Sequence, residues 1–504
     1  MAPQMYLPGF YFDPEKNRYF PVKGPIPGSK RTASASRDSV SDQKDHDQTG
    51  VTGRRTKLKA SELLQLRELN GRNVTSGNLR YDFIQDYQKF KASNPLVWIY
   101  HRTANAAGTG VEQLHGVVQT PTGLERSSLL VAGSMSGCAR IYVVGDAGRH
   151  LDNGDEYMPK TVWPQNNHDK INTNIARIWS STGLSTLLDS SISSVRPMYK
   201  QPADSLDDVT YSKHLLHENM VTTLGSGQGG GSVNIMNLNI PLEIDSSTFR
   251  LQRRMRTIFP TKFTIWTADC SSNGRNAAIG TNVGAALVDI ETGKMSSHRL
   301  KSDVFSLQFD QSGNIVFCGL RKGAILPVDV RVRHFRSLRN YAGYRSMSNE
   351  VQEDSNSSSM PSAICSLAIL KSDEKYLLGS SMDGCIQLFD LRLLRRPVQS
   401  YKGHVNSHSH LQLGVDPSES FFMSGGEDHF LRIWSIKTGE LLFAKNFANA
   451  TLNSICWSQT GNISKDMQQS SEETVRHHES KWELDQSWRA WLGSHKGLFY
   501  MHGI

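Results

Sequence analysis

Seven hairpin-like units repeat along this chain, and they limit its possible folds more than any other feature. Each unit is an apolar strand that ends in small residues, followed by a tight turn and a second apolar strand. Helical periodicity is absent from about residue 112 onward, so the repeats predict an all-β region. The units are LLVAGSMSGCARIYVV, MVTTLGSGQGGGSVNIMNL, AAIGTNVGAALVDIETG, IVFCGLRKGAILPVDVR, YLLGSSMDGCIQLFDLR, FFMSGGEDHFLRIWSIKTG and AWLGSHKGLFYMHG. Hairpins repeated in this way bury their apolar faces by stacking on one another.

A further apolar strand precedes several of the hairpins. These upstream strands are ISSVRP (192–197), VFSLQFD (304–310), ICSLAIL (364–370) and LNSICWS (452–458). Four-stranded units in this number predict a seven-bladed β-propeller, which leaves few strand edges exposed. The last unit supplies three strands, so we expect LVWIYH (96–101) to provide its fourth. Residues near Val97 to Tyr100 should therefore pair with residues 450–504 in one blade.

Composition is consistent with a large core and a reducing compartment. Of the 504 residues 38% are hydrophobic, and the six cysteines are scattered without a C-x-x-C pair. The N-terminus has no apolar signal core and no apolar run is long enough to cross a bilayer, so we expect nucleus and/or cytoplasm. The formal net charge is +8, with basic clusters at 250–256, 321–339 and 392–396. Such clusters are either solvated surface or contacts for nucleic acid or an acidic protein.

The region before the repeats divides into three segments. Residues 1–23 carry two aromatic triplets around Asp13-Pro14-Glu15-Lys16-Asn17, which predicts a hairpin with a five-residue turn. Residues 24–56 contain almost no large apolar side chains and are expected to be disordered. Residues 57–93 predict a helix-loop-helix with apolar side chains at helical spacing, which include Leu63, Leu66, Phe83 and Tyr87.

The propeller is expected to occupy residues 94–504. Two stretches within it are rich in polar residues and predict mobile inserts, near 334–361 and 459–487.

Signals for catalysis, metals or cofactors are weak. GSGQGGG (225–231) satisfies G-x-G-x-x-G, but a second strand follows it in place of a helix, so it is interpreted as a hairpin turn. His404, His408 and His410 have no second ligand cluster at a fixed spacing, which favours structural roles. No hydrolase, zinc-protease or phosphate-loop motif occurs. We therefore expect a protein that is not an enzyme and that uses no metal and no cofactor.

The unit at residues 402–439 resembles a WD repeat almost position by position. It contains Gly403-His404, followed by Ser424, Asp428 and Trp434. The resemblance implies that His404, Ser424, Asp428 and Trp434 form a buried hydrogen-bonded tetrad, a network that stabilises a blade when every member is satisfied. The other six units lack the tryptophan, with Tyr142, Met236, Val288, Val328, Phe389 and Tyr500 in its place.

Two neighbouring units end in Asp-x-Arg, at Asp329–Arg331 and at Asp390–Arg392. Residues two apart on an extended strand point to the same side, so each aspartate can hold the guanidinium that follows it. A guanidinium held in this way is a preorganised planar donor, although a single surface pair of this kind is often only a local ion pair. Because the two units are adjacent, Arg331 and Arg392 should emerge side by side on one face.

The paired boxes resemble those of WD-repeat substrate receptors that dock onto the damage-specific DNA-binding adaptor of cullin-4 RING ubiquitin ligases. PGFYFDPEKNRYF together with the boxes is most similar to the group of cullin-4-associated factor four, also called WD-repeat protein twenty-one. The resemblance implies adaptor contacts by Asp329, Arg331, Asp390 and Arg392, and by the helices that carry Leu63, Leu66, Phe83 and Tyr87. The first box departs from the pattern at Lys322, where an acid is usual, and at Val328, where an aromatic residue is usual.

The resemblance implies a non-catalytic receptor that links a protein substrate to the adaptor and to the cullin-4 ligase. The alternative is a nucleic-acid-binding or general scaffold propeller, which the basic clusters favour. An unrecognised hydrolase would need a convergent pocket that the sequence does not indicate.

Overall fold

The fold is given by a computed structural model, which describes residues 10–13, 18–21, 89–145, 148, 154–164, 177–200, 216–226, 229–243, 250–331, 360–392, 396–458 and 488–503. The chain divides into two compact units, Met1–Lys57 and Leu58–Ile504. In the first unit, β1 (Phe10–Asp13) pairs with β2 (Arg18–Pro21) in an antiparallel hairpin. This confirms the predicted hairpin, with Asp13 paired to Arg18 as the last ladder position instead of lying in the turn.

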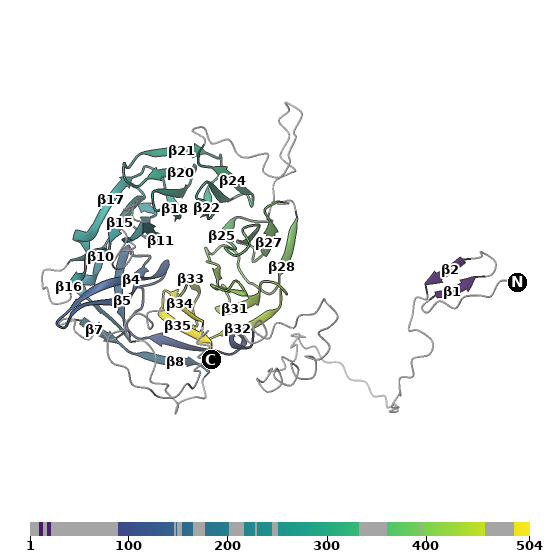
Figure 1. Cartoon of the computed structure of the whole chain (residues 1–504), viewed down its shortest axis with the longest axis horizontal. Coiled ribbons are helices and arrows are strands. Elements are labelled where there is room, and N and C mark those ends of the chain that lie inside the picture. The colour runs from purple at the N-terminus through teal and green to yellow at the C-terminus, as the bar shows by residue number, and fades with distance from the viewer. Residues whose placement is uncertain are drawn as a thin grey trace, which may run out of the picture. The chain divides into compact units, whose positions relative to one another are not determined.

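Seven sheets form a ring in the second unit, as Figure 1 shows, and they are numbered here as blades 1 to 7 along the chain. Blade 1 contains β4 (Gly110–Thr120), β5 (Gly123–Gly133), β6 (Cys138–Val144), β7 (Gly154–Tyr157), β9 (Ile178–Ser181) and β10 (Ser185–Leu187), with β16 (Leu242–Glu243) parallel to β4. Blade 2 contains β11 (Ile192–Lys200), β12 (Leu216–Thr223), β15 (Ser232–Asn237) and β17 (Met255–Pro260). Blade 3 contains β18 (Ile265–Cys270), β19 (Asn276–Thr281), β20 (Gly284–Asp289) and β21 (Met295–Arg299).

The remaining blades follow in the same order. Blade 4 contains β22 (Val304–Phe309), β23 (Ile315–Leu320) and β24 (Ile325–Asp329), and blade 5 contains β25 (Ile364–Ile369), β26 (Tyr376–Ser381), β27 (Ile386–Asp390) and β28 (Pro397–Tyr401). Blade 6 contains β29 (Gly414–Val415), β30 (Phe421–Gly425), β31 (Phe430–Ser435) and β32 (Leu441–Asn446). Blade 7 contains β33 (Leu452–Trp457), β34 (Arg489–Ser494), β35 (Gly497–Gly503), β3 (Pro95–Tyr100) and β8 (Pro159–Trp163).

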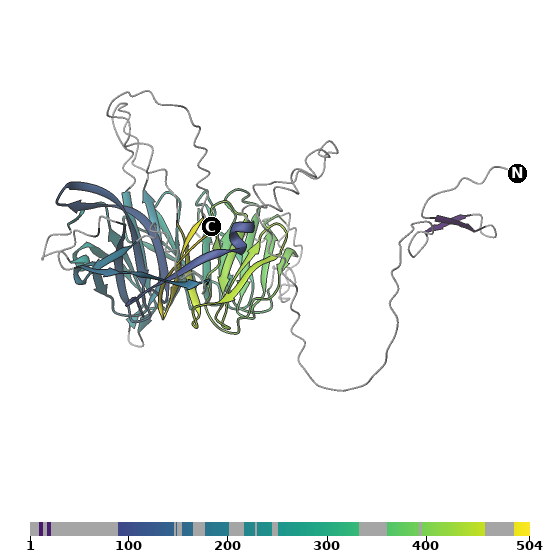
Figure 2. The ribbon, with the colours of Figure 1, turned by 90° about the horizontal axis from the view of Figure 1, so that it is seen from below.

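The seven-bladed propeller and all seven hairpins of the sequence analysis are thereby confirmed. Figure 2 shows the ring edge-on, with the strands of the blades running through its thickness. The tight turns in blades 4 and 5 need glycine, because Gly323 and Gly384 both have φ of +83°. A Cβ atom at Gly323 would lie 2.1 Å from the carbonyl oxygen of Met360.

The predicted closure of the ring is also confirmed. β3 pairs with β35 in an antiparallel ladder in which Trp98 faces Tyr500 and Val97 faces Met501. A strand from before the first repeat therefore completes the last blade.

Blades 1, 4 and 7 differ from the predicted pattern of four strands in every blade, and blade 7 has five strands because β8 pairs with β3. Blade 1 is larger because residues 154–187 add β7, β9, β10 and the 3₁₀ turn η2 (Thr182–Leu184). Blade 4 has three strands among the residues that the structure describes. A second 3₁₀ turn, η3 (Leu251–Arg254), precedes β17. The small hairpin of β13 (Gly225–Ser226) and β14 (Gly229–Gly230) confirms that GSGQGGG is a turn.

Several predictions lie partly or wholly outside the described residues. The helix-loop-helix of residues 57–93 is described only at residues 89–93, which are helical. The segment 24–56 and nearly all of the inserts 334–361 and 459–487 are likewise outside the described ranges. No helix within those ranges combines the length and apolar character that a membrane crossing requires.

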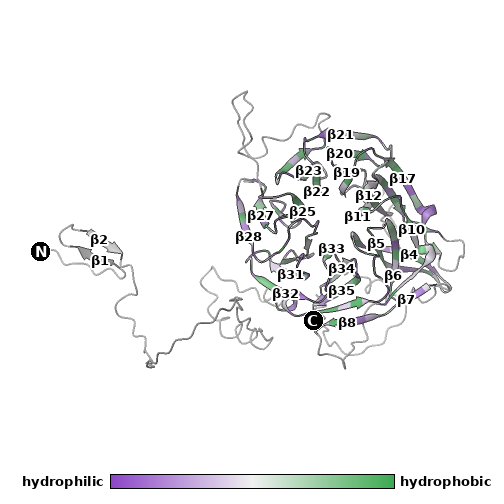
Figure 3. Ribbon diagram, turned by 180° about the vertical axis from the view of Figure 1, so that it is seen from behind, coloured by the Kyte–Doolittle hydropathy of each residue, from purple (hydrophilic) through white to green (hydrophobic). Residues whose placement is uncertain are grey.

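Apolar packing between neighbouring blades holds the ring together. The buried side chains fall into seven clusters, one at each of the seven blade interfaces. Burial of apolar surface contributes roughly 25 cal/mol per Å², so each interface stabilises its two blades. The residues of the outer strands β17, β21 and β28 are exposed or half-buried, except Tyr401 at the end of β28, and Figure 3 shows hydrophilic residues among them.

A ring of seven polar bridges joins the innermost strands around the central axis. At six interfaces a side chain bonds to the backbone of the adjacent blade, and at the seventh two side chains form an ion pair. The bridges are Arg196 Nε to Ala268 O (3.3 Å), Phe309 N to Asp269 Oδ2 (2.8 Å), Ile369 N to Gln308 Oε1 (3.2 Å), Leu413 N to Ser366 Oγ (3.1 Å), Ile455 N to Gln412 Oε1 (3.2 Å), Gln113 N to Cys456 Sγ (3.2 Å) and the Glu112–Arg196 ion pair (3.7 Å).

Candidate functional site

The two Asp-x-Arg boxes lie at the ends of the third strands of blades 4 and 5. Asp329 is the last residue of β24 and pairs with Ile315, and Asp390 is the last residue of β27 and pairs with Tyr376. Ile315 and Tyr376 each begin the second strand of their blade, directly after the turn from the first strand. Both boxes therefore lie at the edge of the ring where first strands end and second strands begin.

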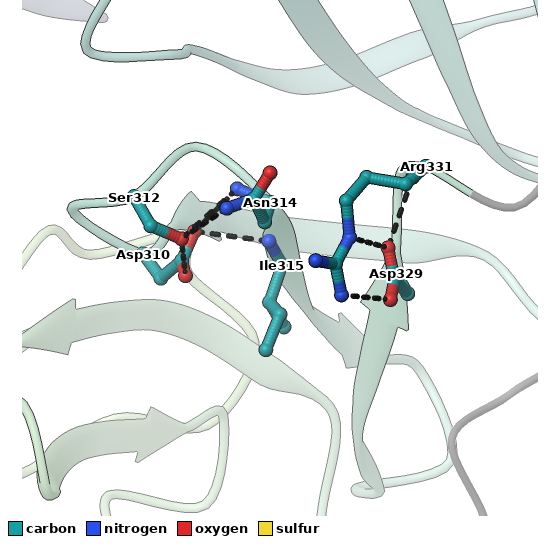
Figure 4. Close-up of polar contacts among 6 residues, drawn as sticks. All are labelled: Asp310, Ser312, Asn314, Ile315, Asp329 and Arg331. Atoms are coloured by element: carbon teal, nitrogen blue, oxygen red, sulfur yellow. Dashed lines mark hydrogen bonds and ion pairs between the residues drawn. The ribbon is translucent and has the colours of Figure 1, made fainter.

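Each arginine is held by its aspartate through hydrogen bonds from three donor atoms, and Nε of Arg392 also contacts the second oxygen of Asp390 at 3.2 Å. Arg331 donates to Asp329 from its backbone N (2.9 Å), from Nε (3.0 Å) and from Nη2 (2.7 Å), as Figure 4 shows. Arg392 donates to Asp390 from the same three atoms, at 2.8, 2.9 and 2.6 Å. The geometry is bidentate at the guanidinium, which is the strong and directional form of this pair.

The guanidinium groups are nevertheless open to solvent. The side chains of Arg331 and Arg392 are 64% and 60% exposed, whereas those of Asp329 and Asp390 are 9% and 12% exposed. Hydrogen bonds from the arginine side chains lower the pKa of both aspartates, so both carboxylates are charged at neutral pH. Each pair therefore presents a fixed cationic donor, with its acid on the buried side.

The neighbouring turns of blades 4 and 5 bring the two boxes to one face. Gln311, in the turn after β22, donates from Nε2 to the carbonyl oxygen of Lys371, in the turn after β25 (2.5 Å). The backbone N of Val330 donates to Asn314 O and that of Leu391 donates to Lys375 O, which fixes each box to the turn of its own blade. Arg331 and Arg392 are thus on the same face of adjacent blades, as predicted.

A second carboxylate orders the turn beside Arg331. Asp310 Oδ1 accepts hydrogen bonds from the backbone N atoms of Asn314 and Ile315, both at 2.9 Å, and Ser312 donates to Oδ2. Figure 4 shows this turn on the side of the guanidinium away from the backbone of Arg331. These hydrogen bonds fix the conformation of the turn, which lies next to the guanidinium of Arg331.

The departures of the first box from the family pattern do not change its geometry. Val328 is buried in the cluster between blades 3 and 4, and Lys322 is exposed in the turn that precedes β24. Arg331 is held in the same way as Arg392 despite both differences.

The other blades do not repeat this arrangement where the structure describes them. The corresponding positions are Asn237 and Asn239 in blade 2, Asp289 and Glu291 in blade 3, and Ser435 and Lys437 in blade 6. Within the described residues, a third strand that ends in an aspartate and is followed two residues later by an arginine bound to that aspartate occurs only in blades 4 and 5.

The predicted tetrad in blade 6 is only partly formed. His404 Nε2 lies 3.3 Å from Ser424 Oγ and 2.9 Å from Gly425 O, and its ring is edge-on to Trp434 at 6.1 Å. Trp434 donates instead to Lys402 O (3.0 Å), and Asp428 accepts from Arg432. Three of the four residues are together, whereas Asp428 forms an ion pair with a residue that the prediction did not include.

The three histidines considered as metal ligands do not converge on one site. His408 is 85% exposed beside Glu427, and His410 Nε2 is 3.0 Å from Phe305 O, so the three histidines have separate partners. No group of His, Cys, Asp and Glu suited to a metal ion occurs in the described part of the chain. Leu63, Leu66, Phe83 and Tyr87 lie outside the described residues.

Sequence reasoning missed the polar contacts that connect the turns on the arginine-bearing face. Ser272 Oγ donates to Gln311 O (2.9 Å), and the carboxylate of Glu419 accepts from Ser372 N (2.9 Å). Together with the Gln311–Lys371 bond they join the turns of blades 3 to 6. The turns themselves can be predicted, because they are rich in Asp, Ser and Gly. The contacts between them cannot, because the contacting residues are far apart in the sequence.

Residues 220–456 match the family model described as the DDB1- and CUL4-associated factor 4 beta-propeller domain. This span includes both Asp-x-Arg boxes and the blade 6 tetrad.

Some of the curated relatives have related names. The chain is 23% identical to DDB1- and CUL4-associated factor 4 of Bos taurus over 452 residues, which cover 86% of this chain and 78% of the relative. It is 34% identical to the Homo sapiens protein of that name over 156 residues, covering 31% of this chain and 28% of the relative. It is also 33% identical to the Homo sapiens DDB1- and CUL4-associated factor 4-like protein 2 over 163 residues, covering 32% and 37%.

Proposed function

Since this chain carries a β-propeller of the DDB1- and CUL4-associated factor 4 family, we propose that it is a non-catalytic substrate receptor that links target proteins to DDB1 and CUL4. In this proposal DDB1 is the adaptor and CUL4 is the scaffold of a RING ubiquitin ligase. The face with Arg331 and Arg392 binds the adaptor, and the segment 57–93 supplies a second contact through Leu63, Leu66, Phe83 and Tyr87.

One observation supports the proposal most strongly. Adjacent blades each present an exposed guanidinium that a buried carboxylate holds through bidentate hydrogen bonds. Two such groups at a fixed separation are preorganised for acceptors on a partner, because little side-chain entropy is lost on binding. A simple surface ion pair would not require the same arrangement twice on one face.

The mechanism requires no bond formation by this protein. A receptor that holds its target on a ligase increases the effective concentration of the target lysine near the activated ubiquitin. The propeller would act as a rigid spacer between adaptor and target. Its seven apolar interfaces would keep the two binding faces at a constant distance and orientation. All six cysteines are free thiols, which supports a reducing location such as the nucleus or cytoplasm.

The test is capture of the adaptor and the cullin by the full-length protein from cells. We expect Arg331→Ala combined with Arg392→Ala to reduce recovery of both partners strongly, with the fold intact by circular dichroism. Lys437→Ala is the matched control, because Lys437 follows the third strand of blade 6 without an aspartate two residues before it. Asp390→Asn keeps Arg392 but weakens the contacts that hold it, and it should give an intermediate recovery.

Unchanged recovery of the adaptor by the double variant would remove the role assigned to the arginines. Basic surface residues favour a second candidate, a nucleic-acid-binding propeller, because Arg250, Arg253 and Arg256 are exposed and follow one another at intervals of three residues. Strong retention of the purified protein on nucleic acid at low salt, lost as salt increases, would support that candidate.

A further inference from the structure

A row of cations lies at the opposite end of the blades from Arg331. It consists of Lys262, Lys301, Arg321 and Lys322, which are all exposed and which we call the basic rim. Arg321 and Lys322 are in the turn before β24, whereas Arg331 follows the end of the same strand. A full strand therefore separates the basic rim from the docking arginines.

Backbone hydrogen bonds make the basic rim continuous across blades 3 and 4. Asn282 N donates to Thr264 O, Leu300 N donates to Val283 O, and Arg321 N donates to Asp303 O. These three bonds connect residues 261–264, 282–283, 300–303 and 321–323 in series. The four cations therefore lie on consecutive loops of one edge, although 60 residues separate the first cation from the last in the sequence.

Charge on these four segments is almost entirely positive. Asp303 is the only acidic residue in them, and its side chain is 18% exposed. It pairs with Arg321, whose Nη1 lies 3.1 Å from Asp303 Oδ2 while the arginine side chain is 68% exposed. Arg321 is thus another exposed guanidinium held by a carboxylate, and the three lysines around it have no acidic partner on these segments.

We propose that the basic rim binds an acidic segment of the target protein through its aspartate and glutamate side chains. The inference rests on the receptor function proposed above and specifies the class of substrate. The exposed guanidinium of Arg321 can donate two parallel hydrogen bonds to a carboxylate of the target, and three flanking ammonium groups attract further acids along the same segment. Blade 5 ends the row, because Asp383 occupies the corresponding turn and accepts hydrogen bonds from Ser381 and from Cys385 N.

A protein ligand fits this surface better than single-stranded nucleic acid does. Binding of unpaired bases uses exposed aromatic side chains as stacking platforms. The exposed large hydrophobic residues in the described part of the chain are Leu124, Met135, Met158, Leu187, Ile240, Val398 and Val405, and none of them is aromatic. The one aromatic side chain on the four rim segments, Phe263, is half-buried, so the basic rim offers hydrogen-bond donors and positive charge without a fully exposed stacking platform.

The test compares charge reversal at the basic rim with the same reversal elsewhere. The first variant is Arg321→Glu with Lys322→Glu, and its control is Arg253→Glu with Arg256→Glu, which changes net charge equally on the outer side of blade 2. The probes are a labelled peptide rich in Glu, the same peptide with Gln in place of Glu, a phosphoserine peptide and a single-stranded oligonucleotide. Fluorescence anisotropy measures the Kd of each probe for the full-length protein.

We expect the wild-type protein to prefer the Glu peptide to the Gln peptide, and the rim variant to bind the Glu peptide roughly tenfold more weakly. The control variant should keep wild-type affinity. Absence of binding by the wild type, an equal loss in the control, or tighter binding of the oligonucleotide or the phosphopeptide would overturn the inference.

Adaptor capture separates this inference from the proposed function. The rim variant should recover the adaptor as the wild type does, since the rim and the docking arginines lie at opposite ends of β24. Loss of the adaptor in the Arg331 and Arg392 variants tests the receptor function alone. Normal capture by the rim variant with unchanged peptide binding would reject the basic rim and leave the receptor function in place.

Discussion

Replacement of Glu112 by glutamine should make the stability of the propeller less dependent on pH. Glu112 is part of the polar ring at the centre of the blades, where its side chain is 15% exposed and pairs with Arg196 at 3.7 Å. Burial raises the pKa of Glu112 from its usual 4.5 to about 7, against the opposing effect of Arg196. A carboxyl group whose pKa is raised on folding stabilises the folded state below its unfolded pKa, and this contribution is lost as pH increases through the folded value.

The magnitude follows from the two pKa values. Between about pH 5.5 and about pH 8, ionisation of Glu112 lowers the free energy of unfolding by roughly 2 kcal/mol, since one pKa unit corresponds to about 1.4 kcal/mol. In the Glu112→Gln variant the amide side chain would keep the shape of the glutamate and an acceptor for Arg196, but it cannot ionise. The difference in unfolding free energy, variant minus wild type, should therefore become more positive by roughly 2 kcal/mol over this pH range.

Urea denaturation at the two pH values measures this difference. His410 and Asp269 are also buried, with the pKa of His410 lowered and that of Asp269 raised by burial, so the wild type alone would report their combined titration. The comparison of the variant with the wild type removes the parts of these contributions that do not depend on Glu112, and the direct effect of Asp269 is to raise the pKa of Glu112 further. Gln412→Glu, which adds a carboxyl at another bridge of the same ring, should increase the pH dependence instead. A difference between Glu112→Gln and wild type that stays constant with pH would refute the assigned titration of Glu112.

Two further predictions concern the blades themselves. Trp434→Ala should lower the free energy of unfolding by about 3 to 5 kcal/mol, because Trp434 is fully buried and stacks on Phe422 at 5.1 Å, and thermal or urea unfolding measures the loss. Trp434→Phe should cost less, with the loss of the hydrogen bond to Lys402 O. Backbone amides of Val97 to Tyr100 should exchange as slowly as those of Phe499 to Met501, because β3 pairs on one side with β35 and on the other with β8. Rapid exchange in β3 alone would contradict ring closure in solution.

Local patterns in the sequence were sufficient for the hairpins and for the two Asp-x-Arg boxes. Strand alternation and turn glycines act over a few residues, so β26 and β27 and the position of Arg392 after Asp390 can be predicted directly. The partner of β3 could be predicted because the last unit lacked a strand. Whether these arginines bind the adaptor stays a prediction.

Contacts over long sequence distances account for most of what was missed. The bridge from Gln113 to Cys456 joins the first and last blades, and no local pattern marks either residue. The strands added to blade 1 are short and weakly apolar, so Gly154–Tyr157 and Ser185–Leu187 do not stand out from loops. Asp428 differs from its predicted role because Arg432, on the same hairpin, offers it a charged partner.

The pairing of β3 with β35 has a consequence for synthesis of the protein. The two strands are about 400 residues apart in the chain, and β3 also pairs with β8. During translation β3 would leave the ribosome early. Blade 7 could be assembled only after Gly497–Gly503 had been synthesised. During that interval the apolar side chains of β3 are available to chaperones or to the wrong strand, so nascent chains stalled shortly before Gly497 should be more prone to aggregation than the finished protein.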